Sequence, residues 1–278
     1  MNIKKFTPFI FSFGLLLTSC QKEEVDVQEE ASEKQEKVSK ETLEQIEDLS
    51  FNSKDVELID MLLPDGSTEE TYLIEGDILM NPDQLEALST ESITSKQYHT
   101  YNLVSTPGTV NIIGFTGGSG QGLTSKQRTA LQRAVSNYNA LNLDLNFTLT
   151  FGTNYGPYDI VVYQNPNGQA GGVAGFPSNG NPYKYVQIFS GMENYSTATN
   201  EHVITHEIGH AVGLRHTDWA TRQSCGQSGE AADPSGAVHI PGTPTGYDPN
   251  SIMLACFSAS ESGNFGYYDE VALRYLYQ

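Results

Sequence analysis

The chain has 278 residues, 38% of them hydrophobic, which suits one sizeable core with additional segments rather than two full domains. The formal net charge is -19, but residues 21–95 carry 22 acidic and 5 basic side chains, whereas residues 96–278 carry 12 and 8. Because no stretch gathers enough Lys and Arg to neutralise a phosphate backbone, nucleic acid is excluded as an expected partner.

Residues 1–19 are typical of an export signal peptide. Two lysines precede an apolar run from Phe9 to Leu17, which is too short to span a bilayer. The run leads into Leu17-Thr18-Ser19-Cys20, which resembles the lipobox of bacterial lipoproteins. This resemblance implies cleavage before Cys20 and a diacylglyceryl group on its sulfur, so the partner would be a membrane. An ordinary secretory signal is the alternative.

Residues 20–41 contain almost no large apolar side chains and many acidic ones, so they cannot bury enough surface to fold. We expect a lipidated, solvated tether, with a short coiled helix as the alternative. Its first residues, Gln21-Lys22-Glu23-Glu24, resemble the acidic export signal of surface-exposed lipoproteins. We therefore expect a bacterial outer-membrane lipoprotein at the cell surface, with the periplasmic face or secretion as alternatives.

Residues 42–96 have the pattern of a small folded segment. Apolar side chains between Leu43 and Phe51 have helical spacing, Met61–Ser67 reads as a turn, and Tyr72–Met80 reads as a strand. Inside this strand the sequence Ile74-Glu75-Gly76-Asp77-Ile78 contains a Gly-Asp pair, which turn chemistry also favours.

Residues 97–278 contain the patterns of a larger α+β domain. A helix is predicted at 125–141, where Thr124 and Gln127 have the spacing of a capping box. A second helix is expected to start at a cap formed by Thr199 or Asn200, and a third closes the chain. Strands are predicted at 109–116, 145–151, 159–164, 171–177 and 185–190.

The sequence HEIGHAVGLRH places three histidines around a glutamate. His206 and His210 are four residues apart, so on a helix they share one face, and Glu207 lies beside them. His216 can join them only if the helix ends and the chain turns back, which Gly213 permits because glycine readily adopts positive φ. Three imidazoles with one open position are the ligand set of a catalytic zinc ion.

The wider stretch HEIGHAVGLRHTDW resembles the metzincin zinc metallopeptidases, and the dual-action HEIGH metallopeptidase family in particular. The resemblance implies an α+β fold with a twisted, mixed five-stranded sheet, two long helices and a C-terminal helix. It makes His206, His210 and His216 the ligands of one Zn²⁺ ion and Glu207 the general base. It also makes Met253 the residue of a Met-turn beneath the zinc, while calcium binding stays open.

The same resemblance locates the substrate and a latency device. Extended substrate is expected at the sheet edge formed by Val173, Ala174 and Gly175. Residues 42–96 are interpreted as a prosegment, because Ile74–Ile78 resembles the propeptide motif of the astacin branch of the metzincins. In that motif the aspartate fills the open zinc position, so Asp77 is a candidate latency switch. A hairpin turn with an exposed Gly-Asp pair is the alternative.

Cys225 and Cys256 remain once Cys20 carries lipid, and in an oxidising compartment such a pair predicts a disulfide. We expect this bond to close a loop of about 30 residues and to contribute about 3 kcal/mol to stability. Asp218, two residues after the third histidine, is expected to orient either a histidine ligand or the loop.

The sequence therefore predicts a monomeric, lipid-anchored zinc endopeptidase that hydrolyses proteins or peptides and is made as a latent precursor. The alternative is a surface-displayed binding lipoprotein, an adhesin or glycan binder, with a structural zinc on the same scaffold. Glu207 argues against the alternative, because a purely structural zinc has no use for an unliganded base.

Overall fold

The computed structural model describes residues 38–90, 100, 102–227 and 239–278. In these parts of the chain, no helix is both long and apolar enough to cross a membrane. The predicted signal peptide, the lipidation site Cys20 and most of the tether lie outside the described residues. The predicted boundary between prosegment and larger domain, at residues 96 and 97, also lies outside them.

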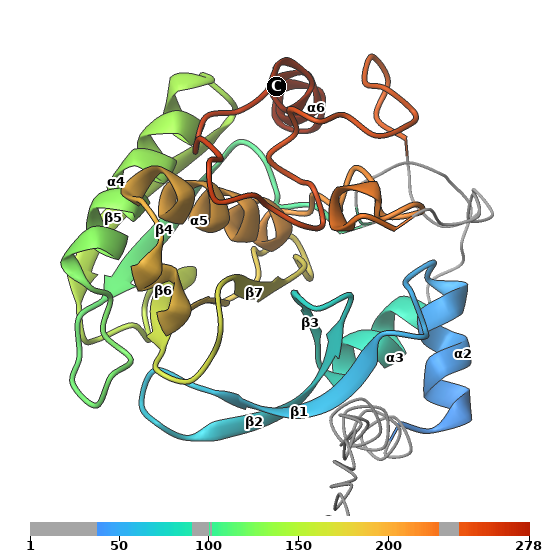
Figure 1. The fold of residues 1–278 in the computed structure, drawn as a ribbon, viewed down its shortest axis with the longest axis horizontal. Helices are drawn as coiled ribbons and strands as arrows, with labels where there is room; N and C mark the ends of the chain where they lie inside the picture. Colours follow the sequence, from blue (N-terminus) through green and yellow to red (C-terminus); the bar gives the residue numbers. More distant parts are fainter. Residues whose placement is uncertain (1–37, 91–99, 101, 228–238) are drawn as a thin grey trace, which may run out of the picture.

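The protein is an α+β structure, and the segment predicted to be a prosegment, referred to below by that name, lies along one side of the larger domain (Figure 1). The prosegment contains β1 (Val56–Leu62), β2 (Thr68–Ile74), β3 (Ile78–Met80) and α3 (Pro82–Thr90). Helix α2 (Lys40–Asp48) precedes them and begins two residues before the predicted boundary, so the last residues of the predicted tether are helical. The larger domain contains β4 (Gly108–Phe115), α4 (Ser125–Ala140), β5 (Leu145–Gly152), β6 (Ile160–Asn165), β7 (Gly172–Gly175), β8 (Tyr185–Phe189), α5 (Thr197–Ala211) and α6 (Tyr267–Tyr277). Two short 3-10 turns, Ser190–Asn194 and Gln223–Cys225, complete it.

The described strands form one mixed sheet in the order β1-β2-β3-β7-β8-β6-β4-β5. The prediction of a mixed sheet is confirmed, but the predicted number of five strands is wrong, because there are eight. Five come from the larger domain, where β7 runs antiparallel to β8, and the prosegment adds three. The extra strands join because β3 pairs in parallel with β7, Ile78 opposite Ala174 and Leu79 opposite Gly175. An edge strand offers unpaired backbone groups, and here the prosegment satisfies them.

The predicted single strand Tyr72–Met80 is wrong, because the chain reverses between β2 and β3. Glu75 has φ of 57° and Gly76 has φ of 87°, both in the left-handed region that a tight reversal uses. Glycine occupies this region at low steric cost, whereas Glu75 is a non-glycine residue there. The turn brings Asp77 to the end of β7, where its carbonyl oxygen accepts a hydrogen bond from the Ala174 amide at 3.0 Å.

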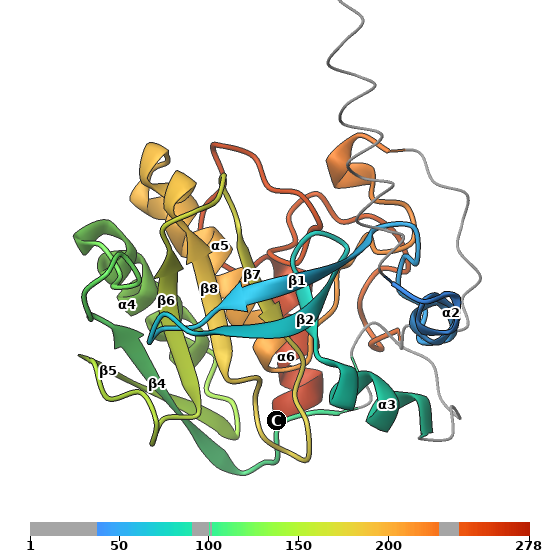
Figure 2. The same ribbon diagram turned by 90° about the horizontal axis from the view of Figure 1, so that it is seen from below.

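Helices α4 and α5 pack against each other and cover one face of the sheet (Figure 2). The predicted capping box at the start of α4 is present, formed by Thr124 and Gln127. Helix α5 begins earlier than predicted, since Ser196 caps it by accepting a hydrogen bond from the Thr199 amide at 3.0 Å. Almost all of α5 is buried, which holds its side chains in fixed positions.

The prosegment has a small apolar core, and Phe176 of the larger domain packs into this core. Phe51 stacks on Phe176 with ring centroids 5.8 Å apart, and Phe176 in turn packs edge-on against His210 at 5.5 Å. The prosegment is therefore joined to the larger domain by apolar packing as well as by strand pairing. The other buried members of this core are Val38, Ile46, Leu49, Val56, Ile74, Ile78, Met80 and Leu85.

Candidate active site

The three histidines of HEIGHAVGLRH converge at the end of α5. His206 and His210 lie one turn apart on the helix, with ring centroids separated by 4.6 Å. Gly213 has φ of 110°, and the Leu214 amide donates to the Gly209 carbonyl at 2.9 Å, so the helix ends there. The chain turns back and places the ring of His216 4.8 Å from that of His210.

The hydrogen bonds of the histidines fit a metal ion. Nδ1 of His206 donates to the Ile252 carbonyl and Nδ1 of His210 to the Leu214 carbonyl, both at 2.8 Å. Nδ1 of His216 donates to a carboxylate at 3.1 Å. With Nδ1 protonated, each Nε2 directs a lone pair inward. Nε2 of His210 and of His216 lie 3.2 Å apart, and the buried Nε2 of His206 has no hydrogen-bond partner. Such lone pairs repel unless a cation lies between them.

Asp77 completes the group from the opposite side. Its Oδ2 lies 2.9 Å from Nε2 of His216 and 3.5 Å from Nε2 of His206. Ligand atoms of Asp77, His206, His210 and His216 all lie within 4.8 Å of one another. Burial would raise the pKa of Asp77, but the charge of His216 and the neighbouring imidazoles of His206 and His210 hold it well below its usual range. Three imidazoles and an ionised carboxylate are a donor set that suits zinc.

Glu207 lies beside the ligands on the side facing β7. A Cβ atom added to Gly172 would lie 2.8 Å from Cγ of Glu207, so only glycine allows β7 to approach this side chain so closely. Oε2 of Glu207 is buried and has no hydrogen-bond partner. Burial, and then the charge of Asp77, raise the pKa of Glu207 well above its ordinary value.

Met253 lies directly under the helix that carries the ligands. A Cβ atom added to Gly209 would lie 2.6 Å from Sδ of Met253, so the glycine of HEIGH is required for this contact. Asp269, at the start of α6, accepts hydrogen bonds from the Ile252 amide at 2.8 Å and from Oγ of Ser251 at 2.7 Å. Because the Ile252 carbonyl accepts from a zinc-site histidine, α6 helps to hold this turn in position.

The predicted disulfide between Cys225 and Cys256 is present. Beside it, the Asp218 carboxylate accepts hydrogen bonds from the Ser224 amide at 2.8 Å and the Ala255 amide at 2.9 Å. Asp218 therefore orients the loop, the second of the two predicted roles. The disulfide and Asp218 together join the segment after the third histidine to the segment after the Met-turn.

A cavity of about 280 Å³ adjoins Glu207. The predicted substrate edge, Val173 to Gly175, is buried and pairs with β3, so its role toward substrate stays a prediction. His202, one turn before the first histidine of the motif, lines this cavity but does not belong to the metal-binding group. Other lining residues are Gly172, Phe189, Val203, Arg222, Leu254 and Phe257.

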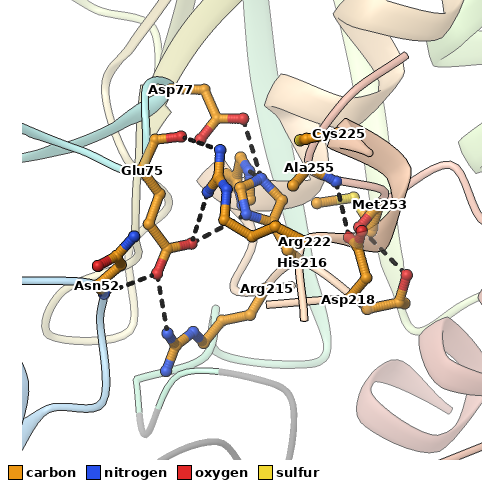
Figure 3. A network of polar contacts seen from close by, with 12 residues as sticks. Asn52, Glu75, Asp77, Arg215, His216, Asp218, Arg222, Cys225, Met253 and Ala255 are labelled. Atoms are coloured by element: carbon orange, nitrogen blue, oxygen red, sulfur yellow. Dashed lines mark hydrogen bonds and ion pairs between the residues drawn. The ribbon is translucent and has the colours of Figure 1, made fainter. Parts of the chain in front are cut away.

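Glu75, Arg215 and Arg222 form a buried charge cluster that sequence reasoning missed (Figure 3). Oε2 of Glu75 is the acceptor for Nδ1 of His216. Nη2 of Arg215 lies 3.9 Å from Oε1 of Glu75, and Nη1 of Arg222 lies 3.8 Å from its Oε2. Burial would raise the pKa of Glu75, but the hydrogen bond and charge of His216 outweigh it and lower the pKa. The available signal was a second acidic residue, two positions before Asp77, between the apolar residues Ile74 and Ile78.

The sequence model of the dual-action HEIGH metallo-peptidase family matches residues 71–277. The chain belongs to this family. It is a metallopeptidase, its family implies zinc, and the histidine and aspartate group can hold one such ion. The matched residues include the turn that carries Asp77.

Two solved structures of myroilysin are similar to this metallopeptidase, each with 14% sequence identity. One has a TM-score of 0.42 and covers 68% of this chain and 92% of myroilysin. The other has a TM-score of 0.39 and covers 61% and 79%. Among curated proteins, none matches the chain.

Proposed function

We propose that this metallopeptidase is a lipid-anchored endopeptidase that is made as a latent precursor, with residues 42–96 as the inhibitory prosegment. One observation carries the latency proposal: Asp77 of the prosegment lies among the three histidines, with Oδ2 2.9 Å from Nε2 of His216. A carboxylate at this point takes the position that a catalytic zinc site keeps open for water or substrate.

The larger domain supplies the parts of a peptide-hydrolysing site. Zinc, when bound to the three histidines, supplies the Lewis acidity that activates water and polarises the scissile carbonyl. Glu207 accepts a proton from this water and returns it to the leaving amine. Burial contributes most to the raised pKa of Glu207 and the charge of Asp77 adds to it, so removal of Asp77 lowers this pKa and favours the carboxylate that accepts the proton.

The strand pairing supports an endopeptidase that binds extended substrate. Strand β7 lies at the edge of the five strands contributed by the larger domain, and β3 pairs with it. A peptide bound there as an added strand would gain backbone hydrogen bonds along its length, which suits cleavage inside a chain. In the precursor β3 already holds this edge, so substrate is excluded from the edge and from the zinc site together.

Anchoring and location rest on the sequence. Cys20 in its lipobox-like context supports a lipid anchor, the acidic tether of residues 20–41 supports display away from the membrane, and the disulfide suits an oxidising compartment. Labelling of cells with a radioactive fatty acid should mark the wild-type chain and not a Cys20→Ser variant. Equal labelling of both would refute the anchor.

The proposed activity is tested with Glu207→Ala in zinc-loaded protein from which the prosegment has been removed. We expect the variant to keep one zinc per chain but to hydrolyse a casein or peptide-library substrate about 10²- to 10⁴-fold more slowly, as loss of a general base predicts. Glu270→Ala is the matched control, because Glu270 lies on α6 and forms an ion pair with Arg274 in the same helix. Unchanged hydrolysis by the Glu207 variant would refute the mechanism, and no hydrolysis by the wild type would favour the binding lipoprotein.

A further inference from the structure

The cluster around Glu75 is a cationic pocket in the wall of the peptidase domain. We define this carboxylate pocket by three groups: the guanidinium groups of Arg215 and Arg222 and the Nδ1 hydrogen of His216. All three face the Glu75 carboxylate in Figure 3. The carboxylate enters from the prosegment, whereas all three cationic or donor groups belong to residues 97–278. The pocket is next to the metal site, because the same His216 presents Nε2 to that site.

Glu75 fills this pocket with imperfect geometry. Its distances to Arg215 and Arg222, 3.9 and 3.8 Å, are those of ion pairs and exceed hydrogen-bond length. Nη1 of Arg222 is buried without a hydrogen-bond partner, while Nη2 donates to the Glu75 carbonyl at 3.0 Å. Glu75 also has left-handed backbone geometry, so the turn fixes where its carboxylate can reach. The pocket thus has donor capacity that Glu75 leaves unused.

Departure of the prosegment would remove Glu75, the acidic residue that forms these ion pairs with Arg215 and Arg222. Arg215 also donates to the carbonyl groups of Leu49 and Ser50 and lies under the ring of Phe51, all in the prosegment. The nearest acid of the peptidase domain along the chain, Asp218, is already held by two backbone amides. Buried positive groups cost free energy unless an anion pairs with them.

We propose that the carboxylate pocket becomes a specificity subsite of the processed enzyme, selecting substrates with an acidic side chain close to the scissile bond. Glu75 in the precursor occupies the place of that substrate side chain. Glu75 and Asp77 are two residues apart, and Asp77 lies at the metal site, so the acidic residue belongs within two residues of the bond that is cut. This inference rests on the proposed endopeptidase function.

The test uses the zinc-loaded full-length chain after proteolytic removal of its prosegment. Peptides of one sequence are compared as Glu/Gln and Asp/Asn pairs at each of the two positions on either side of the scissile bond. We expect an acidic residue at one position to raise kcat/KM about 10- to 100-fold over its amide, as charge-assisted hydrogen bonds predict. Binding of the same peptides to a Glu207→Ala variant, which cannot cleave them, should show the same preference.

Variants of Arg222 identify the pocket as the source of the preference. Arg222→Lys should keep part of the acid-to-amide ratio, and Arg222→Glu should abolish it and favour Lys at the same position. Arg128→Glu is the matched control, because Arg128 contacts Leu123 and Ser125 at the start of α4, and it should leave the ratio unchanged. Hydrolysis without any acid preference, or a preference that survives Arg222→Glu, overturns the subsite alone. No hydrolysis of any peptide refutes the endopeptidase and the subsite with it.

Discussion

Replacement of Asp77 by alanine should make the uncut precursor active. The side chain contacts Nε2 of His216 and of His206, and its charge raises the pKa of Glu207. Loss of a charge-assisted contact is worth about 1.5–3 kcal/mol, which corresponds to about 10- to 100-fold more of the open precursor. The gain stops short of full activity, because β3 still pairs with β7 and the apolar core around Phe176 still joins the two parts.

The assay compares initial rates of peptide hydrolysis by zinc-loaded Asp77→Ala and Asp60→Ala precursors and by the processed wild type. Asp60 is the matched control, since it is exposed on β1 of the same prosegment. Electrophoresis of each sample must show an uncut chain over the time of the measurement. An Asp77→Ala precursor no faster than the Asp60 control would refute Asp77 as the latency switch. A rate equal to that of the processed enzyme would show instead that β3 contributes nothing to latency.

Three further predictions concern stability. Gly209→Ala should lower the free energy of unfolding by about 1–3 kcal/mol in urea titrations, because the new methyl group meets Met253 at 2.6 Å; an unchanged midpoint would contradict this packing. Replacing both Cys225 and Cys256 by serine should cost about 3–4 kcal/mol by loop closure over 31 residues, and equal melting of the variant and the oxidised wild type would count against it. Burial lowers the pKa of His202 to about 4, so the unfolded chain binds its proton more readily below pH 6.5, and stability falls as pH drops toward 4. A His202→Leu variant should lose about 3 kcal/mol less than the wild type between pH 7 and 4, measured by urea unfolding at both values.

The zinc-site geometry was predictable because it depends on local spacing. Two histidines four apart must share a helix face, and Gly213 had to end that helix for His216 to return. The glycine at 209 was part of the recognised motif, but its steric reason, contact with Met253, depends on a segment more than 40 residues away. The capping box at Thr124 was likewise local and correct.

The prosegment's place in the sheet was not predictable from spacing. Strand β3 has three residues, too few for a pattern, and its pairing with β7 joins positions nearly 100 residues apart. The reversal at Glu75 and Gly76 had a signal in the Gly-Asp pair, for which a hairpin turn was the alternative, but apolar residues flank the pair on both sides and continue the strand pattern. The ion pairs of Glu75 with Arg215 and Arg222 were not predictable either, because electrostatic contacts between residues far apart in the sequence leave no periodic pattern.

With the prosegment as the proposed inhibitor, the pairing of β3 with β7 would separate cleavage of the chain from activation. While the prosegment is part of the chain, its strand meets β7 at an effective concentration on the order of millimolar, so re-docking is fast after any opening. A cut between α3 and β4 would break the covalent link between the prosegment and the larger domain but none of the described contacts. The product would be a non-covalent complex of the two parts. Dilution, or destruction of the released piece, would then decide when activity begins. A freshly cut molecule would stay inactive where the released prosegment is concentrated and would become active once the prosegment dissociates and diffuses away.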